Sequence, residues 1–378
     1  MFRMRAPHTK TVQATSAQAA TGDRDGTGAT VPPLVALADL EARAAERLEP
    51  AAFAYYAGGA ADEVTLADNV VAWGRHRLRP RVLVDVSSID PASTVLGTPV
   101  AMPAGIAPTA LHGLASDEAE VATARAAARA GVLFCLSSLA SRPMEDLAGI
   151  DGPRWYQLYA HSDRGITADL LARAAASGFG AIALTADLPV FGRRERELRS
   201  GFAQPSAAGY GNFAVYAEGG DVAAVTAGLH TSLLTWDDLE WVREASPLPI
   251  VLKGVLTAAD AGRACDAGLA GVWVSNHGGR QLDRTPASVD VLAEVVEAVA
   301  GRAEVYVDGG VRRGSDVLVA RALGATAVFA GRPWLFALAS GGEEGVVEAL
   351  AVLRAELENA MALLGTPTIA DVTRAHVV

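Results

Sequence analysis

Short apolar runs alternate with longer alanine-rich stretches along most of this chain. The longer stretches carry helix start and stop signals, as in the segment that opens with Asp117 and Glu120 and closes at Gly131. Alternation of this kind predicts a series of β-strand and α-helix units. The expected strands are residues 103–107, 132–136, 155–158, 181–184, 250–252, 272–274, 305–307 and 327–330.

Units of this kind build either an open, doubly wound sheet or a closed barrel. Eight short strands favour the closed form, so we predict an α/β fold, a (β/α)8 TIM barrel. A helical pattern from Leu34 and a second one from Pro50, which Gly58 and Gly59 end, predict N-terminal helices before the barrel. Residues 1–33 lack apolar periodicity and are expected to be a disordered extension, whereas residues 34–378 are expected to form a single domain.

An extra stretch at about residues 195–235 separates the fourth and fifth expected strands. A long insertion on the functional side of a barrel is more often an active-site lid than simple surface disorder. We therefore expect an extended lid after strand 4.

Composition and charge narrow the possible partners. The formal net charge of −11 argues against a nucleic acid or an anionic membrane, because both attract clusters of Lys and Arg. Cys135 and Cys265 show no CxxC spacing, and the histidines are dispersed, so neither a disulfide framework nor a metal site is expected. The sequence shows neither an apolar run long enough to span a bilayer nor a signal-peptide core, and a cytoplasmic protein is expected.

Polar residues follow almost every expected strand. In a (β/α)8 barrel the reactive groups lie at the carboxyl ends of the strands, and a purely structural barrel has no need for such a series. The polar residues found there are Thr109, Ser137, Ser138, Gln157, Tyr159, Thr185, Asp187, Lys253, Ser275, Asn276, His277, Asp308 and Arg332.

The residues after the sixth strand pair a base with a carboxylate anchor. His277 titrates near neutrality, and Arg280 offers a fork of donors that matches a carboxylate, so together they suit deprotonation of a bound small acid. By itself, the segment is equally compatible with polar residues at a strand end whose glycines form a turn.

The loops after the seventh and eighth strands have the composition of a phosphate site. Gly309, Gly310 and Arg312 follow one strand, and Gly331 and Arg332 follow the next. Backbone amides reinforced by guanidinium groups bind anions at this position in barrels, although glycine turns that bind nothing are the plainer alternative.

Several motifs together carry a family resemblance over about residues 34–378. The chain resembles the FMN-dependent enzymes that oxidise 2-hydroxy acids, a family that includes glycolate oxidase, lactate oxidase, lactate monooxygenase and mandelate dehydrogenase. The motifs are YYAGG at 55–59, IAPT at 106–109, QLY at 157–159, LTAD at 184–187, GRRE at 192–195, LKG at 252–254, SNHGGRQLD at 275–283, DGGVRRG at 308–314 and GRP at 331–333.

The resemblance implies that the cofactor is FMN. Lys253 would approach flavin N1 and the C2 carbonyl, where a cation stabilises the reduced ring, and Asp308 would contact the ribityl hydroxyls. The phosphate would lie against Gly309, Gly310, Arg312, Gly331 and Arg332. The remaining residues implied to bind FMN are Ala107, Pro108, Thr109, Ser137, Gln157, Tyr159, Thr185 and Ser275.

The resemblance also implies how substrate is bound. Arg194 and Arg280, assisted by Tyr55, would bind the carboxylate, and Tyr159 would hydrogen-bond the 2-hydroxyl. His277 would take the proton while Asp187 stabilises the imidazolium. Leu139 would line the substrate pocket, at a position where short-chain members such as glycolate oxidase typically have Trp.

The implied reaction is oxidation of an (S)-2-hydroxy acid to the 2-keto acid, with dioxygen as acceptor and hydrogen peroxide as product. The alternatives are a dehydrogenase with another acceptor and a monooxygenase-like oxidative decarboxylation. The presence of His277, Arg194 and Arg280 argues against an inactive flavin-binding barrel. A homo-oligomer, a tetramer or octamer, is expected from the resemblance.

Overall fold

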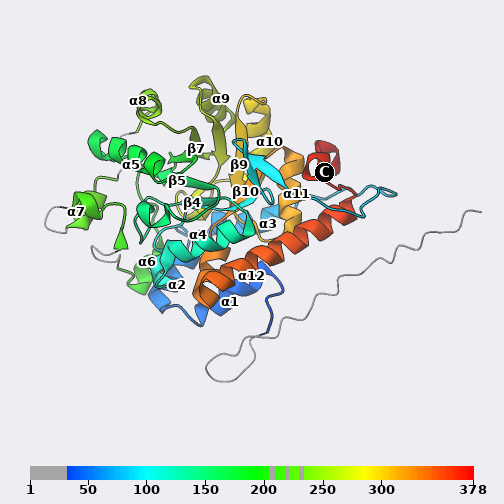
Figure 1. Ribbon diagram of the computed structural model, residues 1–378, viewed down its shortest axis with the longest axis horizontal. Coiled ribbons are helices and arrows are strands. Elements are labelled where there is room, and N and C mark those ends of the chain that lie inside the picture. Colours follow the sequence, from blue (N-terminus) through cyan, green and yellow to red (C-terminus); the bar gives the residue numbers. More distant parts are fainter. Residues whose placement is uncertain (1–31, 204–208, 218–220, 230–233) are drawn as a thin grey trace, which may run out of the picture.

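A computed structural model describes residues 32–203, 209–217, 221–229 and 234–378. Within these residues, eight parallel strands close into a barrel, in the order β10-β3-β4-β5-β6-β7-β8-β9 (Figure 1). Pairing of Val328 with Ala104 joins the last strand to the first. The predicted (β/α)8 barrel is confirmed, and each strand lies within a few residues of its expected position. The strands are β3 (Ala104–Ile106), β4 (Phe134–Leu136), β5 (Arg154–Leu158), β6 (Ala181–Thr185), β7 (Ile250–Val255), β8 (Gly271–Val274), β9 (Glu304–Asp308) and β10 (Ala327–Ala330).

Helices surround the barrel, and the long α12 lies along α4 and α1 (Figure 1). The predicted glycine stop at Gly131 is confirmed, because it ends α4 with a φ of 66°, and Gly324 ends α11 in the same way with a φ of 104°. The helices that surround the barrel are α4 (Ala119–Ala130), α5 (Arg164–Ala176), α8 (Asp238–Ala245), α9 (Ala258–Asp266), α10 (Ser288–Val299), α11 (Gly314–Leu323) and α12 (Arg332–Leu364). In the described residues, no helix has both the length and the apolar character needed to cross a membrane.

The predicted helix start near Glu120 is confirmed, because α4 begins at Ala119, but the Glu120 side chain bonds to neighbouring loops and not to its own helix. Its side chain is fully buried, and its carboxylate accepts hydrogen bonds from the backbone amides of His112, Ser141 and Arg142 at 2.9–3.0 Å. Glu120 therefore ties together the loops that follow β3 and β4. The reason is energetic: a buried carboxylate needs several donors, and these loops supply more of them than its own helix does.

Aromatic side chains fill the interior of the barrel. Trp155, Trp273, Tyr306 and Phe329 pack against one another, and the ring centroids of Trp273 and Phe329 are 4.0 Å apart. The hairpin of β1 (Ser93–Val95) and β2 (Thr98–Val100), which the sequence pattern did not predict, packs against this cluster. With this apolar filling below, the polar residues are left at the carboxyl ends of the strands.

The helices before the barrel are α1 (Leu40–Ala45), α2 (Pro50–Ala57) and α3 (Val64–Trp73). The predicted helix from Pro50 is confirmed as α2, and Pro50 occupies its first turn. The expectation for the extension concerns residues 1–31 for the most part, which lie outside the described residues.

The expected lid segment is described in part. It contains α6 (Glu195–Ser200), a 3₁₀ turn at Ala214–Tyr216 and α7 (Val222–Thr226), while residues 204–208, 218–220 and 230–233 lie outside the described residues. Helix α6 packs on α2. Phe202, just after α6, stacks on Tyr55 with 4.5 Å between ring centroids, so this part of the segment covers the helix that carries Tyr55.

Candidate active site

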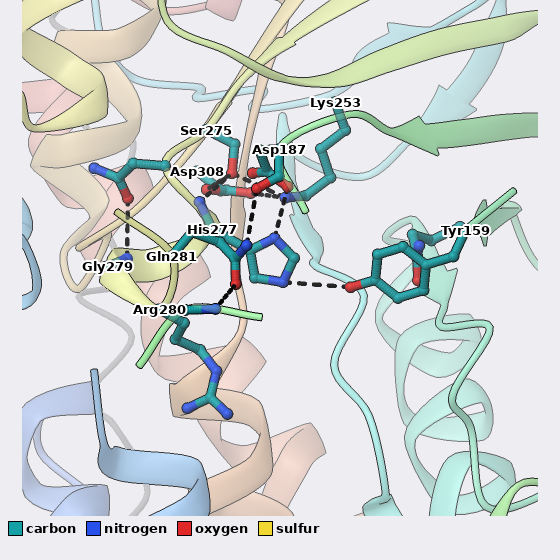
Figure 2. A network of polar contacts seen from close by, with 12 residues as sticks. Tyr159, Asp187, Lys253, Ser275, His277, Gly279, Arg280, Gln281 and Asp308 are labelled. Carbon is teal, nitrogen blue, oxygen red and sulfur yellow. Dashed lines mark hydrogen bonds and ion pairs between the residues drawn. The ribbon is translucent and has the colours of Figure 1, made fainter. Parts of the chain in front are cut away.

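His277 lies at the carboxyl end of β8 between an acid and a phenol (Figure 2). Its Nδ1 is 2.8 Å from Asp187 Oδ1, and its Nε2 is 3.4 Å from the Tyr159 hydroxyl. The backbone of His277 has a left-handed φ of 58°, and its amide donates to Ser275 Oγ at 3.0 Å. Because an ionised Asp187 accepts a hydrogen bond from Nδ1–H, the lone pair of Nε2 faces the cavity and can accept a proton.

The surroundings keep His277 neutral and Asp187 charged. Burial lowers the pKa of His277, although Asp187 opposes that shift. Burial by itself raises the pKa of Asp187, but its interactions with His277 and Lys253 outweigh that effect and hold the pKa below its ordinary value. A neutral imidazole beside a carboxylate is the arrangement that a general base requires.

Arg194 and Arg280 lie close together on the side of the cavity nearest α6. Arg280 donates from NH1 to the carbonyls of Tyr55 and Gly58 at 2.7 and 2.9 Å, and its guanidinium lies 4.9 Å from the centre of the Tyr55 ring. Burial, followed by the like charge of Arg194, lowers the pKa of Arg280 to about 10. Two largely buried guanidinium groups side by side favour the binding of an anion within reach of both.

Lys253 is held beneath the cavity by a network on three strands. Its Nζ donates to Ser275 Oγ at 2.8 Å and lies 3.4 Å from Asp308 Oδ2, while Ser275 donates to Asp308 Oδ1 at 2.7 Å. Burial lowers the pKa of Lys253, but Asp308 and Asp187 more than offset it, so the pKa is raised overall. The lysine is therefore a fixed positive charge. Since both oxygens of Asp308 are engaged in this network, its expected contact with the ribityl hydroxyls stays a prediction.

At the end of the cavity that the glycine loops form, neither Arg312 nor Arg332 makes an ion pair within the described residues. Arg332 donates only to backbone carbonyls within the described residues, those of Tyr56, Gly58 and Gly278, at 2.8–3.0 Å. Burial and then the charges of Arg280 and Arg312 lower its pKa to about 9. Uncompensated buried positive charge of this kind fits a bound anion.

Glycine is required in the adjoining loop. Gly310 has a φ of 80°, and a Cβ there would lie 1.8 Å from the carbonyl oxygen of Asn69. Gly309 has a φ of 99°, and its carbonyl accepts a hydrogen bond from Trp73 Nε1 at 2.8 Å. Helix α3, which carries Asn69 and Trp73, thus holds the loop in the conformation that exposes its amides.

One cavity, with an empty volume of about 1120 Å³ including its mouth, connects all these groups. Every predicted site residue lines it except Asp187, which lies behind His277, and Ser275, which holds Lys253 from beneath. The predicted residues that line the cavity are Tyr55, Ala107, Pro108, Thr109, Ser137, Leu139, Gln157, Tyr159, Thr185, Arg194, Lys253, His277, Arg280, Asp308, Gly309, Gly310, Arg312, Gly331 and Arg332.

Comparison with known proteins agrees with this geometry. The sequence pattern of the family described as FMN-dependent dehydrogenase matches residues 44–378. The chain belongs to this family. It is 47% identical over 351 residues to glycolate oxidase 1 of Oryza sativa subsp. indica, covering 90% of this chain and 94% of that protein. It is 46% identical over 350 residues to the L-lactate oxidase of Nostoc sp., covering 89% and 96%. The solved structure of mandelate oxidase with (S)-2-phenylpropionate has a TM-score of 0.83 and 41% identity, covering 90% of this chain and 97% of that one.

The cavity fits FMN, the cofactor of the family. Gln157 Nε2 and Thr185 Oγ1 are buried without a hydrogen-bond partner in the described part of the chain, as expected of groups that face the polar edge of a ring system. The loops at Gly309–Gly310 and Gly331, with Arg312 and Arg332, would hold the phosphate. Lys253 would supply positive charge to the ring system.

Sequence reasoning missed several cavity residues. Phe191 and Leu188 line the cavity beside Arg194, and Tyr56 lines it beside Tyr55. Gln281 lies within the SNHGGRQLD motif and had no assigned role. Its Nε2 donates to the carbonyls of Asp187 and Val190 at 3.0 and 2.9 Å, so it fastens the loop that carries the acid. Its membership of the motif was the one available signal.

Proposed function

We propose that the protein is an FMN-dependent oxidase that converts an (S)-2-hydroxy acid into the 2-keto acid and passes the electrons to dioxygen. The observation that carries this proposal is the placing of His277 Nε2, backed by Asp187, in the same cavity as Arg194 and Arg280. A base and a carboxylate anchor within one cavity suit a small 2-hydroxy acid. The oxidase names of the relatives support dioxygen as the acceptor.

The residues divide the work of the reaction. Arg194 and Arg280 bind the substrate carboxylate and so fix the orientation of the 2-carbon, while the Tyr159 hydroxyl binds the 2-hydroxyl. His277 Nε2 accepts a proton from the substrate, and Asp187 stabilises the resulting imidazolium. Bound FMN supplies the acceptor for the two electrons. Lys253, fixed by Ser275 and Asp308, provides positive charge where negative charge develops.

Anaerobic mixing of the FMN-loaded protein with 2-hydroxy acids tests this function. We expect the yellow flavin absorbance to bleach with substrate and to return within seconds to minutes when air is admitted, with one equivalent of hydrogen peroxide and of 2-keto acid formed. Bleaching that air reverses only slowly would instead identify a dehydrogenase. Carbon dioxide in place of peroxide would identify an oxidative decarboxylation, and an absence of bleaching with every acid would overturn the proposal.

The walls of the cavity favour a substrate with a large side chain. Leu139 occupies the position where short-chain relatives typically have Trp, and the neighbouring wall is formed by Leu188, Phe191 and Tyr210. These side chains are apolar or aromatic, which suits a medium-chain or aromatic 2-hydroxy acid. A bound (S)-2-phenylpropionate in the solved mandelate oxidase supports an aromatic substrate here.

We therefore expect mandelate or 2-hydroxyisocaproate to be turned over with a kcat/KM about tenfold or more above that of glycolate, the gain from roughly two methylene-sized contacts. Leu139→Trp should remove most of that preference while leaving glycolate turnover nearly unchanged. Steady-state kinetics across glycolate, lactate, 2-hydroxyisocaproate and mandelate decide the matter. A clear preference of the unaltered protein for glycolate would show that the lid, rather than Leu139, limits the pocket.

The assembly and location that we propose rest on the resemblance and on composition alone. A homo-oligomer, tetrameric or octameric, follows from the resemblance, and light scattering of the purified protein would reveal a mass four or eight times that of the chain. A cytoplasmic location follows from the two cysteines without a disulfide pattern.

A further inference from the structure

Glu197, on helix α6, places a carboxylate beside both arginines of the proposed carboxylate site. Its Oε2 lies 3.6 Å from Arg194 NH1 and 3.7 Å from Arg280 NH2. The three side chains are only 11–18% exposed, so solvent screens their charges weakly. Glu197 does not line the cavity itself, so its charge acts on a bound acid without direct contact.

Glu197 does little to position the two arginines. Its distances to them exceed those of a hydrogen bond, and Oε2 has no hydrogen-bond partner among the described residues. The arginines are positioned by other groups. Arg280 NH1 donates to two backbone carbonyls, while Arg194 donates from Nε to the Arg280 carbonyl at 3.3 Å and from NH2 to Gln281 Oε1 at 3.4 Å.

The donors that remain point to a common place. Arg194 NH1 and Arg280 NH2 are the terminal nitrogens that donate no hydrogen bond within the described residues, and they are the same two nitrogens that approach Glu197. The carboxylate of a substrate or product would therefore share its two guanidinium partners with a resident carboxylate. The substrate carboxylate and the Glu197 carboxylate carry like charges, and they repel each other because the partly buried surroundings screen charge weakly.

We infer that Glu197 is a resident counterion that weakens the binding of substrate and product carboxylates to Arg194 and Arg280. It compensates two buried like charges when the site holds no acid, and it competes electrostatically when an acid binds. The result is a site that releases its keto-acid product more readily than a bare arginine pair would. This inference rests on the proposed function.

The direction of the affinity change in one variant distinguishes a competing counterion from a residue that positions the arginines. Glu197→Gln keeps the size of the side chain and removes its charge, so it should tighten binding of a monocarboxylate by on the order of fivefold, the gain expected for one partly screened charge several ångströms away. A residue that merely positioned the arginines would, on replacement, weaken binding.

Titration calorimetry of the FMN-loaded protein can measure the affinity of each variant for two probes of similar shape. (S)-2-Phenylpropionate carries the carboxylate and lacks the 2-hydroxyl, whereas 2-hydroxy-2-phenylacetamide is neutral. Glu197→Gln should tighten the acid alone and leave the amide unchanged. Glu197→Asp, which retains the charge, should bind both like the unaltered protein and shows whether any change comes from shape.

Glu195 on the same helix provides the matched control. It pairs with Arg193 and Arg199, both about three-quarters exposed and outside the cavity, so Glu195→Gln removes an equal charge without touching the arginine pair. We expect no change in affinity for either probe. An equal tightening in Glu195→Gln and Glu197→Gln, or an unchanged or weakened affinity in Glu197→Gln, would overturn the inference. Failure of the unaltered holoprotein to bind the acid would instead count against the proposed function.

Discussion

Replacing His277 with Ala is expected to leave FMN bound and to slow its reduction by a 2-hydroxy acid at least ~10²-fold, the low end for loss of a general base. The imidazole is the one side chain whose unprotonated nitrogen faces the cavity beside Tyr159 while its other nitrogen meets a carboxylate, as far as the described residues show. Its loss removes the proton acceptor without removing the arginines that bind the substrate.

Anaerobic stopped-flow measurement of flavin bleaching gives this rate directly, and the visible spectrum of the variant confirms that FMN is retained. The pH dependence of the unaltered protein is a second check. Burial lowers the pKa of His277, so the unprotonated base persists from neutral pH down past the ordinary imidazole value of about 6.5. Reduction should therefore slow only below that pH. Near-normal reduction in the variant would remove His277 from the mechanism.

Replacing Arg312 with Ala is expected to weaken FMN binding about 10- to 100-fold, equivalent to about 1.5–3 kcal/mol for lost hydrogen bonds to a charged phosphate. Arg312 lines the cavity beside the Gly309–Gly310 loop, and in the described residues its guanidinium donates to the carbonyl of Val311 at 2.9 Å. Burial lowers its pKa, so a bound phosphate would favour its charged form.

Titration of the apoprotein with FMN, followed by flavin fluorescence, measures the affinity. Arg313→Ala is the control, because this neighbour is half exposed and pairs with Glu356 on α12 rather than facing the cavity. The holoenzyme that remains in Arg312→Ala should still bleach at a near-normal rate. Equal losses of FMN in the two variants would indicate damage to the loop and not the loss of a phosphate ligand.

Local pattern was sufficient for the barrel because its determinants are local. A buried parallel strand is a short apolar run, and a helix between strands carries its own stop, such as Gly131 or Gly324. The residue at the end of each strand then falls at the same rim of the barrel, so the candidate site could be listed from the sequence before any contact was known.

The sequence pattern did not predict contacts where a side chain could bond either to its own helix or to a neighbouring loop. Glu120 lies in the first turn of the predicted helix, and the sequence does not indicate that three backbone amides of neighbouring loops donate to its carboxylate. The hairpin of β1 and β2 was missed because its strands are three residues each and include Pro99, a weak local signal. Packing of Val95 and Val100 against the barrel interior stabilises it.

The sequence by itself therefore determined the eight strands, the helix ends that glycine marks, and the chemical types that gather at the rim of the barrel. Only the tertiary structure decided which of those groups act on one another. Asp187 contacts His277 across 90 positions, Gln281 donates across 94 to the carbonyl of Asp187, and Glu197 approaches Arg280 from α6. Hydrogen bonds and charge interactions of this kind depend on distances of a few ångströms, and closure of the barrel sets those distances.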